Sequence, residues 1–522
     1  MRKAQFYKLV ARSIAVVAVG ANLIIAPAHS VTSMRNLHYV EGKDPAAPLF
    51  NPIVVNRVDL MVPQSSIDII NSEYPVEYNA MWWRATNFSY VPAKLKITTA
   101  TKTYGPIDVE IHLKGGWGSL RSLGEKAGFK VKINSTGNKD QRLLGLKKLT
   151  FNNDVQDGSY VHEATAYRLF RNVGVPAPRV GYARIYMNCA PDMNPEQNST
   201  CIDYGLHPNI ETMDEVALAR WVNGTTHLYE GGTPYFPDIY NGAVLQTDLG
   251  DPTDTSDFRE LAQINQLDGA DWYNAMLAHT DLKEMTLEWA TETYVGHWDG
   301  YAANNNNFYL HSDSNGKFRM FPWGTDQTWG GLQDLYVEDG WGPSTMVAKC
   351  NAYAPCREMY AESLVTIWAK AEAINLARMP RDIYSGILAS SMGPQSDPFS
   401  GCNVYCANAN AEGISNFLKS RSDQISPLAT SFALVAPELA ATPTTKTITM
   451  SWVGKKVPGV PIKSYQVQQS IDENTWVSLK LDSPTKTVIR NVTPGRVFYY
   501  RVRAVTSRGT TPWSPTVRVQ SK

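Results

Sequence analysis

The chain has 522 residues, and its 49 Lys and Arg side chains balance 49 Asp and Glu side chains, which gives a formal net charge of zero at pH 7. A neutral chain without long basic runs lacks the electrostatic footprint of a nucleic-acid-binding protein. The length exceeds what a single hydrophobic core usually supports, so two or three domains are expected.

Residues 1–30 predict a secretory signal peptide. A basic start precedes an almost wholly apolar stretch from Ser13 to Ala26, which is too short for a comfortable membrane span. Small residues at the end fit cleavage after Ser30, with cleavage after Ala28 as the alternative. No later stretch approaches the roughly 20 apolar residues of a spanning helix. We therefore expect an exported, soluble protein that is secreted, held at the cell surface or periplasmic.

The 6 cysteines fall as close pairs along the sequence. Pairing by proximity is the simplest connectivity, and an oxidising compartment would permit it. The cysteine spacings do not include CxxC, so a zinc site is not expected. The predicted disulfides are Cys189–Cys201, Cys350–Cys356 and Cys402–Cys406.

The region after the signal peptide predicts strands in VVNRVDLMV, YVPAKLKITT and IDVEIHLKGG, with a helix that starts at Ser65 or Ser66. The segment KGGWGSLRSLGEKAGFKVKINS follows, a glycine-rich turn that leads into a strand containing Lys130. Glycines let backbone N–H groups approach an anion closely, and basic side chains beside them can hold its charge. The alternative is an ordinary glycine-rich hairpin with exposed lysines.

A change to helical periodicity predicts a helix from Tyr160 to Arg171, with Ser159 as its N-cap and Gly174 at its end. Glu163 lies inside this helix. It would either face solvent or pair with a lysine that holds phosphate.

Two carboxylates flank a short predicted strand: Asp299 in HWDGYAANNNNFYL and Asp326 in PWGTDQTWG. A carboxylate can accept a hydroxyl proton, and the hard oxygens of Asn and Asp suit a small divalent cation. The pattern therefore predicts a divalent metal with the phosphates it carries. The alternative for the asparagines is a polar turn. We expect His297 to be structural or orienting rather than a metal ligand.

Beyond Gly330 the sequence is partly helical to about Thr430, notably in REMYAESLVTIWAKAEAINLARM. Short alternating segments then begin near Ala433, separated by Pro, Gly and Asn turns, and predict a β-sandwich. This stretch resembles a fibronectin type III module in Trp452, in the YYRVRAV run and in the closing GTTPWSP. The resemblance implies that Trp452 and either Tyr499 or Tyr500 belong to the core. It also implies that this domain serves as a binding module or as a spacer.

The motifs between about Val109 and Gly330 resemble, in their order, the CotH kinase family of atypical secreted or surface-associated kinases, named after a bacterial spore coat protein. They are LKGGWGSLR with GEKAGFKVKI, KKLTFNN with HEATAYRLFRNVGVPAPR, YGLHPNIE, THLYEG, and HWDGYAANNNNFYL with PWGTDQT. The resemblance implies a fold similar to a reduced protein kinase with two lobes.

In that family, the lysine ahead of the FKVKI-like strand and the arginine after the glycine turn help to hold ATP phosphates. The resemblance therefore implies that Lys126 and Arg121 bind ATP, with Lys130 as a second choice for the same role. Glu163 would pair with a phosphate-holding lysine. Glu211 would lie where the two lobes meet.

The aspartate of the HWD motif takes the place of the catalytic base, which implies Asp299. The asparagine cluster and the later aspartate would hold Mg²⁺ or Mn²⁺, which implicates Asn304, Asn306 and Asp326. The family often has an acidic residue directly after the PW pair, and this chain has Gly324 there.

The expected fold class is α+β. A reduced protein-kinase-like, two-lobed domain at 31–432, with a motif core at about 109–330 and a helical part at 331–432, precedes an all-β fibronectin type III sandwich at 433–522. The first functional hypothesis is an exported kinase that moves the γ-phosphate of ATP to a Ser or Thr hydroxyl of a secreted or envelope protein.

The second hypothesis is a non-catalytic pseudokinase scaffold whose sandwich binds a protein or a polysaccharide. A hydrolase that uses Asp299 and Asp326 as paired carboxylates is a third, and it leaves the basic segment unexplained.

Overall fold

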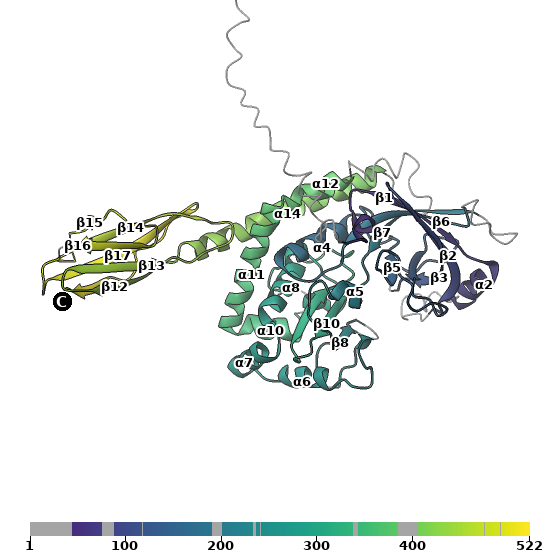
Figure 1. Cartoon of the computed structure of the whole chain (residues 1–522), viewed down its shortest axis with the longest axis horizontal. Helices are drawn as coiled ribbons and strands as arrows, with labels where there is room; N and C mark the ends of the chain where they lie inside the picture. Colours follow the sequence, from purple (N-terminus) through teal and green to yellow (C-terminus); the bar gives the residue numbers. More distant parts are fainter. Residues whose placement is uncertain are drawn as a thin grey trace, which may run out of the picture.

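A computed structural model describes most of the chain (Figure 1). The described residues are 44–75, 88–116, 118–189, 201–232, 236–240, 242–337, 343–384, 404–473, 475–490 and 492–522. The predicted signal peptide and the predicted Cys402–Cys406 disulfide lie outside the residues whose side chains are described.

The first part of the chain forms a closed β-barrel, seen at the right of Figure 1. Its strands, in order around the barrel, are β1 (Val55–Met61), β2 (Val91–Thr98), β3 (Thr103–Lys114), β4 (Gly128–Lys132), β5 (Lys148–Phe151), β7 (Ile202–Ile210) and β6 (Val180–Met187). The parallel pair β1 and β6 closes the barrel, and the other neighbours are antiparallel. In β2, buried apolar residues alternate with less buried positions, as a half-buried strand requires.

Two helix starts differ from the predicted ones. Helix α2 (Gln64–Glu73) begins directly after Pro63, whose carbonyl accepts from the backbone N–H groups of Ser66 and Ile67. Helix α4 (His162–Val173) begins later than predicted, because Ser159 belongs to a turn. The Asp157 carboxylate accepts from the Ser159 backbone N–H and hydroxyl and from the backbone N–H of His162. The local cap is therefore an aspartate outside the predicted helix.

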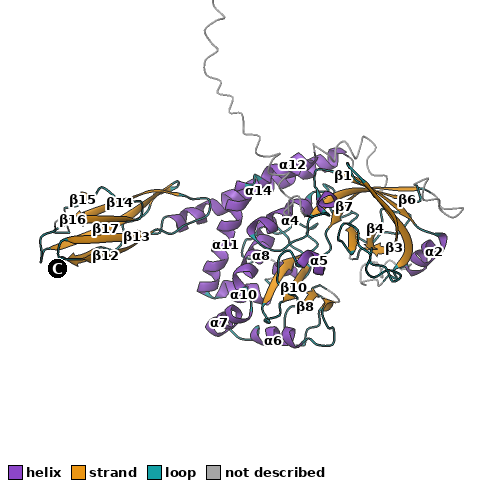
Figure 2. Ribbon diagram, in the orientation of Figure 1, coloured by secondary structure: helices purple, strands orange, loops and turns teal. Residues whose placement is uncertain are grey.

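A second lobe joins a 4-stranded sheet to a group of helices (Figure 2). The sheet order is β11 (Phe318–Pro322), β10 (Phe308–Ser312), β8 (His227–Glu230) and β9 (Gln246–Leu249). The helices are α5 (Glu215–Leu218), α6 (Ser256–Ile264), α7 (Gly269–His279), α8 (Leu282–Val295), α9 (Tyr301–Asn304), α10 (Thr345–Ala352), α11 (Ala354–Ala373), α12 (Met379–Ile383) and α14 (Val404–Ala433), with the short 3-10 turn η3 (Leu376–Arg378). The other 3-10 turn, η1 (Ala47–Phe50), packs into the barrel core instead.

Each lobe has its own apolar core. The barrel core contains Phe129 and Tyr204, while α4 contributes Tyr167 to the larger core around Trp289 of α8. Helix α4 therefore belongs by packing to the helical lobe, although the barrel strands surround it in sequence. Burying such aromatic side chains away from water is the main source of stability for both lobes.

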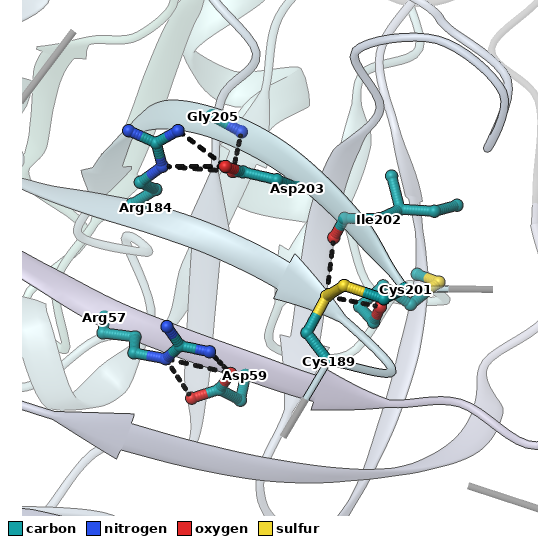
Figure 3. Close-up of a disulfide and its surroundings, with 9 residues drawn as sticks. Arg57, Asp59, Arg184, Cys189, Cys201, Ile202, Asp203 and Gly205 are labelled. Atoms are coloured by element: carbon teal, nitrogen blue, oxygen red, sulfur yellow. Dashed lines mark hydrogen bonds and ion pairs between the residues drawn. A yellow bond between two sulfur atoms is a disulfide. The ribbon is translucent and has the colours of Figure 1, made fainter. Parts of the chain in front are cut away.

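Two predicted disulfides are confirmed. Cys189 and Cys201 join the ends of the neighbouring strands β6 and β7, with a Cα–Cα distance of 4.6 Å (Figure 3). An ion pair between Arg184 and Asp203, at 2.6 Å, crosses the same strand pair nearby (Figure 3). Cys350 and Cys356 join α10 to α11. Among the described helices, none is long and apolar enough to cross a membrane.

The C-terminal part is a β-sandwich, seen at the left of Figure 1. One sheet contains β12 (Glu438–Pro443), β13 (Thr447–Val453) and β16 (Lys486–Arg490); the other contains β15 (Val477–Ser478), β14 (Ile462–Ser470), β17 (Val497–Thr506), β18 (Gly509–Thr510) and β19 (Val517–Gln520). Trp452 and Tyr500 are buried in its core, as the resemblance implied, whereas Tyr499 is only half-buried.

The predicted fold class is confirmed: a mixed helix and sheet domain precedes an all-β sandwich. The sandwich contacts α11 directly. Lys455 Nζ lies 2.8 Å from Glu362 Oε1, and a Cβ added at Gly459 would lie 3.2 Å from the ring of Trp368.

Candidate active site

A cavity of about 680 Å³ lies between the barrel and the sheet of the second lobe. Both segments that the sequence singled out line it. The glycine turn contributes Gly115 and Gly116, and the carboxylate and amide loops contribute Asp299 and Asp326. Residues almost 200 positions apart in the sequence thus share one enclosed space, which is the arrangement that an anion and a cation bound together would require.

The glycine turn is built for close backbone approach. Gly115 has a φ of +139°, and a Cβ at this position would lie 2.7 Å from the Cα of Leu120. Arg121 closes the turn from within, since its Nη1 donates to the carbonyls of Gly118 and Leu120 at 2.9 and 2.8 Å. Arg121 does not line the cavity, so the structure gives this residue a position that supports the turn.

The lysines of this region divide into two groups. Lys130 lines the cavity, as does Lys114 at the end of β3, whereas Lys126 does not. Lys126 is buried, and its Nζ donates to the Tyr160 hydroxyl at 3.0 Å. Sequence reasoning missed Lys114. Its position directly before two glycines was a weak signal in the sequence, because a lysine at the end of a strand is ordinary by itself.

Glu163 projects from α4 into the cavity and is held by Asn152, whose Nδ2 donates to Glu163 Oε2 at 2.8 Å. The other side of the same amide faces Lys114, with 3.3 Å between Lys114 Nζ and Asn152 Oδ1. Burial, and then the charge of Asp326, raise the pKa of Glu163 to about 8, against the opposing charge of Lys114. The lysine near Glu163 is therefore Lys114.

Asp299 is the centre of the amide cluster. Asn304 Nδ2 and Asn306 Nδ2 donate to its Oδ1 at 2.7 and 3.0 Å, and Asn307 Nδ2 donates to its Oδ2 at 3.0 Å. Burial raises the pKa of Asp299, although the three amides oppose the shift. The carboxylate is thus held in one orientation by the three amides, and Asp299 is one of the residues that line the cavity.

Asn307 was not among the predicted site residues, although it also lines the cavity. Its φ of 49° is a left-handed conformation that asparagine tolerates better than most residues. Its side chain lies against Gly324, where an added Cβ would be 2.5 Å from Asn307 Oδ1. This contact explains why glycine stands where the family often has an acidic residue.

Asp326 faces the same cavity from the loop after β11. Burial raises its pKa to about 6, and the positive charge of Lys114 opposes the shift. The Asp326 backbone carbonyl lies 2.6 Å from His162 Nδ1, which ties the loop to the start of α4. Asp326, Asp299 and Glu163 therefore line the same cavity from three different elements.

The donor set fits a divalent cation that arrives with a phosphate ligand. No three His, Cys, Asp or Glu side chains gather as a metal site in the part of the chain that is described. Mg²⁺ is commonly bound through one or two carboxylates plus substrate phosphates, with no all-protein cage. The amides of Asn306 and Asn307 direct their nitrogens at Asp299, so their oxygens are the atoms available to a cation.

Glu211 lies outside the cavity lining, in a buried ion-pair network. Arg179 Nη2 lies 2.8 Å from Glu211 Oε1, Arg179 Nε donates to Oε2 at 3.0 Å, and Arg220 also contacts Oε1. This network fastens the end of β7 to the strand before it. The structure therefore places Glu211 in contact with two arginines at the end of β7, and its position between the lobes stays a prediction.

We predict that Glu211→Ala lowers the free energy of unfolding by about 3–5 kcal/mol, because it removes the carboxylate that both Nε and Nη2 of buried Arg179 contact and that Arg220 also contacts, and leaves Arg179 with Asp44. Urea unfolding, followed by tryptophan fluorescence, measures the free energy of unfolding of the variant and of the parent. Glu215→Ala is the matched control, since this more exposed glutamate pairs with Lys147 and should cost about 1 kcal/mol or less. Equal midpoints for the two variants would contradict a structural role for Glu211.

The barrel lobe, the helical lobe and the charged cavity between them define a two-lobed, kinase-like domain. Residues 111–360 match the family model described as CotH kinase protein, and residues 436–520 match that of the fibronectin type III domain. The chain therefore carries a CotH kinase domain followed by a fibronectin type III domain.

A comparison with curated proteins finds no match. Among solved structures, a β-1,2-glucanase from Parabacteroides distasonis is 27% identical over 17% of this chain and 13% of that chain, with a TM-score of 0.15. A human FNIII domain is 20% identical over 17% of this chain and 75% of that chain, also with a TM-score of 0.15. A segment of titin is 16% identical over 17% of this chain and 32% of that chain, with a TM-score of 0.16. The chain thus spans 13% of the glucanase's length.

Proposed function

We propose that this chain is an exported protein kinase that transfers the γ-phosphate of ATP to a Ser or Thr hydroxyl of a secreted or envelope protein. One observation carries the proposal: Lys114 and Lys130 line one cavity together with Asp299 and Asp326. Phosphoryl transfer needs little covalent chemistry from a protein and much placement of charge.

Each group has a role that its position supports. Lys114, Lys130 and the backbone of the glycine turn would bind the phosphates. Asp299 would accept the proton of the acceptor hydroxyl, since its amide neighbours hold one carboxylate orientation. Asp326 and Asn306 would hold Mg²⁺ or Mn²⁺, which when bound would neutralise charge on the phosphates.

Export is supported by the two disulfides, because structural disulfides persist mainly in oxidising compartments. The acceptor would then be a protein that shares this compartment.

The direct test incubates the purified full chain with radiolabelled ATP, Mn²⁺ or Mg²⁺, and a generic protein acceptor. Label on the acceptor or on the chain itself is the expected result, and phosphoamino-acid analysis should find phosphoserine or phosphothreonine. Nucleotide binding without transfer under any metal would favour the pseudokinase scaffold instead.

Lys114→Ala should weaken ATP binding about 10- to 100-fold, because a charge-assisted contact to phosphate is worth roughly 1.5–3 kcal/mol. Lys126→Ala should mainly lower the melting temperature, because its amine pairs with Tyr160 beneath the turn. Calorimetric titration with a non-hydrolysable ATP analogue, at a temperature where both variants are folded, separates the two. A larger loss of affinity in Lys126→Ala than in Lys114→Ala would overturn this assignment and restore the family-based one.

A further inference from the structure

Helix α8 carries three glutamates one turn apart, Glu284, Glu288 and Glu292, with side chains that point into the protein. They are 6%, 0% and 0% exposed. Wholly buried carboxyls are rare unless each has a partner, because desolvation of a charge is costly. The phosphoryl-transfer roles above use none of the three.

Glu292 receives two backbone hydrogen bonds from the segment after Asp299. The Tyr301 N–H donates to Glu292 Oε1 at 3.1 Å, and the Ala302 N–H donates to Oε2 at 2.7 Å. These are the first N–H groups of α9, whose N-cap residue, Gly300, has no side chain to satisfy them. A glutamate from another helix thus does the work of a capping side chain.

The fit around this carboxylate is tight on both sides of Asp299. A Cβ added to Gly300 would lie 2.5 to 2.8 Å from the Glu292 carboxylate atoms. On the other side, the His297 N–H donates to the Glu292 backbone carbonyl at 2.8 Å. The backbone that carries Asp299 is therefore fixed to Glu292 two residues before Asp299 and two residues after it.

Glu288 lies one turn below Glu292, and neither of its buried carboxyl oxygens has a hydrogen-bond partner in the described part of the chain. Burial, together with the charge of the facing Glu292, raises the pKa of Glu288 well above its ordinary value. Burial also raises the pKa of Glu292 to about 7, and the hydrogen bonds from the backbone N–H groups of Ala302 and Tyr301 oppose that shift.

Three other titratable groups face Glu292. His297 Nδ1 lies 4.0 Å away, and burial lowers the pKa of this imidazole to about 3, so it stays neutral. Asp299 adds a repulsive negative charge. Tyr360 of α11 is also near and stays neutral, because burial raises its pKa.

We propose that Glu292 is a positioning residue for phosphoryl transfer, whose carboxyl group fixes the Asp299 loop through the backbone N–H groups of Tyr301 and Ala302. The expected effect on phosphoryl transfer rests on the proposed kinase function. The fixing of the Asp299 loop by Glu292 does not depend on that function. Misplacing a reacting group by about 1 Å can cost on the order of 100-fold in rate.

Glu292→Gln tests the positioning role. The glutamine amide offers only one oxygen acceptor to the two N–H donors of Tyr301 and Ala302. Its own NH₂ group then faces the second of these donors. We expect kcat to fall on the order of 100-fold with little change in the KM for ATP. An unchanged kcat in a folded Glu292→Gln protein would overturn the proposal.

Hydrogen exchange on the full chain provides a readout that needs no activity. The amides of Tyr301 and Ala302, in α9, should exchange at least 10-fold faster in Glu292→Gln than in the parent, while the amides of α8 keep their protection. Unchanged protection of both amides would overturn the positioning role even if the parent proves inactive. If these two amides lose protection in Glu292→Gln but the parent chain does not transfer phosphate, the fixing of the Asp299 loop by Glu292 is supported and only the proposed kinase function is contradicted.

Discussion

Asp299→Ala should lower kcat for phosphoryl transfer by about 10²- to 10⁴-fold, because general-base contributions are of that size. Asp299 receives amide hydrogen bonds from Asn304, Asn306 and Asn307 and reaches the cavity. Removing it takes away the proton acceptor and leaves the cavity lysines in place. The affinity for ATP should therefore change far less than kcat.

The measurement is steady-state transfer from ATP with the acceptor protein saturating. Asp251→Ala is the matched control, since this aspartate is fully exposed in a loop and should behave as the parent does. A melting temperature near that of the parent must accompany the loss of rate. If a folded Asp299→Ala protein keeps more than about a tenth of the parental kcat, Asp299 is not the base.

Asp326→Asn should be the second most damaging change, because it removes the carboxylate that would hold the cation together with Asn306. Mg²⁺ and Mn²⁺ bind few protein ligands beside the phosphates, so each carboxylate counts strongly. We expect both the rate and the metal-dependent part of ATP affinity to fall by about two orders of magnitude. Without metal, parent and variant should bind ATP with similar weak affinity.

Electron paramagnetic resonance of Mn²⁺, titrated in the presence of an ATP analogue, reads out this change without any turnover. Asparagine has nearly the same size and shape as aspartate and keeps one oxygen acceptor, so we do not expect the variant to unfold. Parental Mn²⁺ binding in Asp326→Asn would remove this aspartate from the site. Rescue of the rate by higher Mn²⁺ concentration would support the role.

Much of the fold follows from local sequence pattern. The alternation in YVPAKLKITT predicted a strand that exists as β2, and Gly174 ends α4 as its left-handed cap. Closure of the barrel was not predicted, because the parallel pairing of β1 with β6 joins segments more than 100 residues apart and has no local signal. The start of α4 was mispredicted since Asp157, outside the helix, takes over the role assigned to Ser159.

The site was partly foreseeable. Sequence motifs drew attention to Asp299, Asn306 and Asp326, and the structure brings all three to one cavity, though their chemical roles stay predictions. Lys114 was missed because a lysine at a strand end is ordinary by itself. Only the folded contact with Asn152 and the proximity of Glu163 single it out.

The position of Lys126 could not be predicted from sequence for a related reason. A lysine beside a glycine turn can face either side of the turn, and burial against Tyr160 decides which. Glu292 is the same kind of case. Its helical spacing is typical of a core-facing position, and only the approach of α9 gives its carboxylate a partner.

The most direct test of the central claim is the position of Mn²⁺ in a crystal of the full chain grown with a non-hydrolysable ATP analogue. Anomalous scattering should place the metal against Asp326 and Asn306, with the phosphates between it and Lys114. Nucleotide bound elsewhere, or a metal remote from both Asp299 and Asp326, would contradict the account.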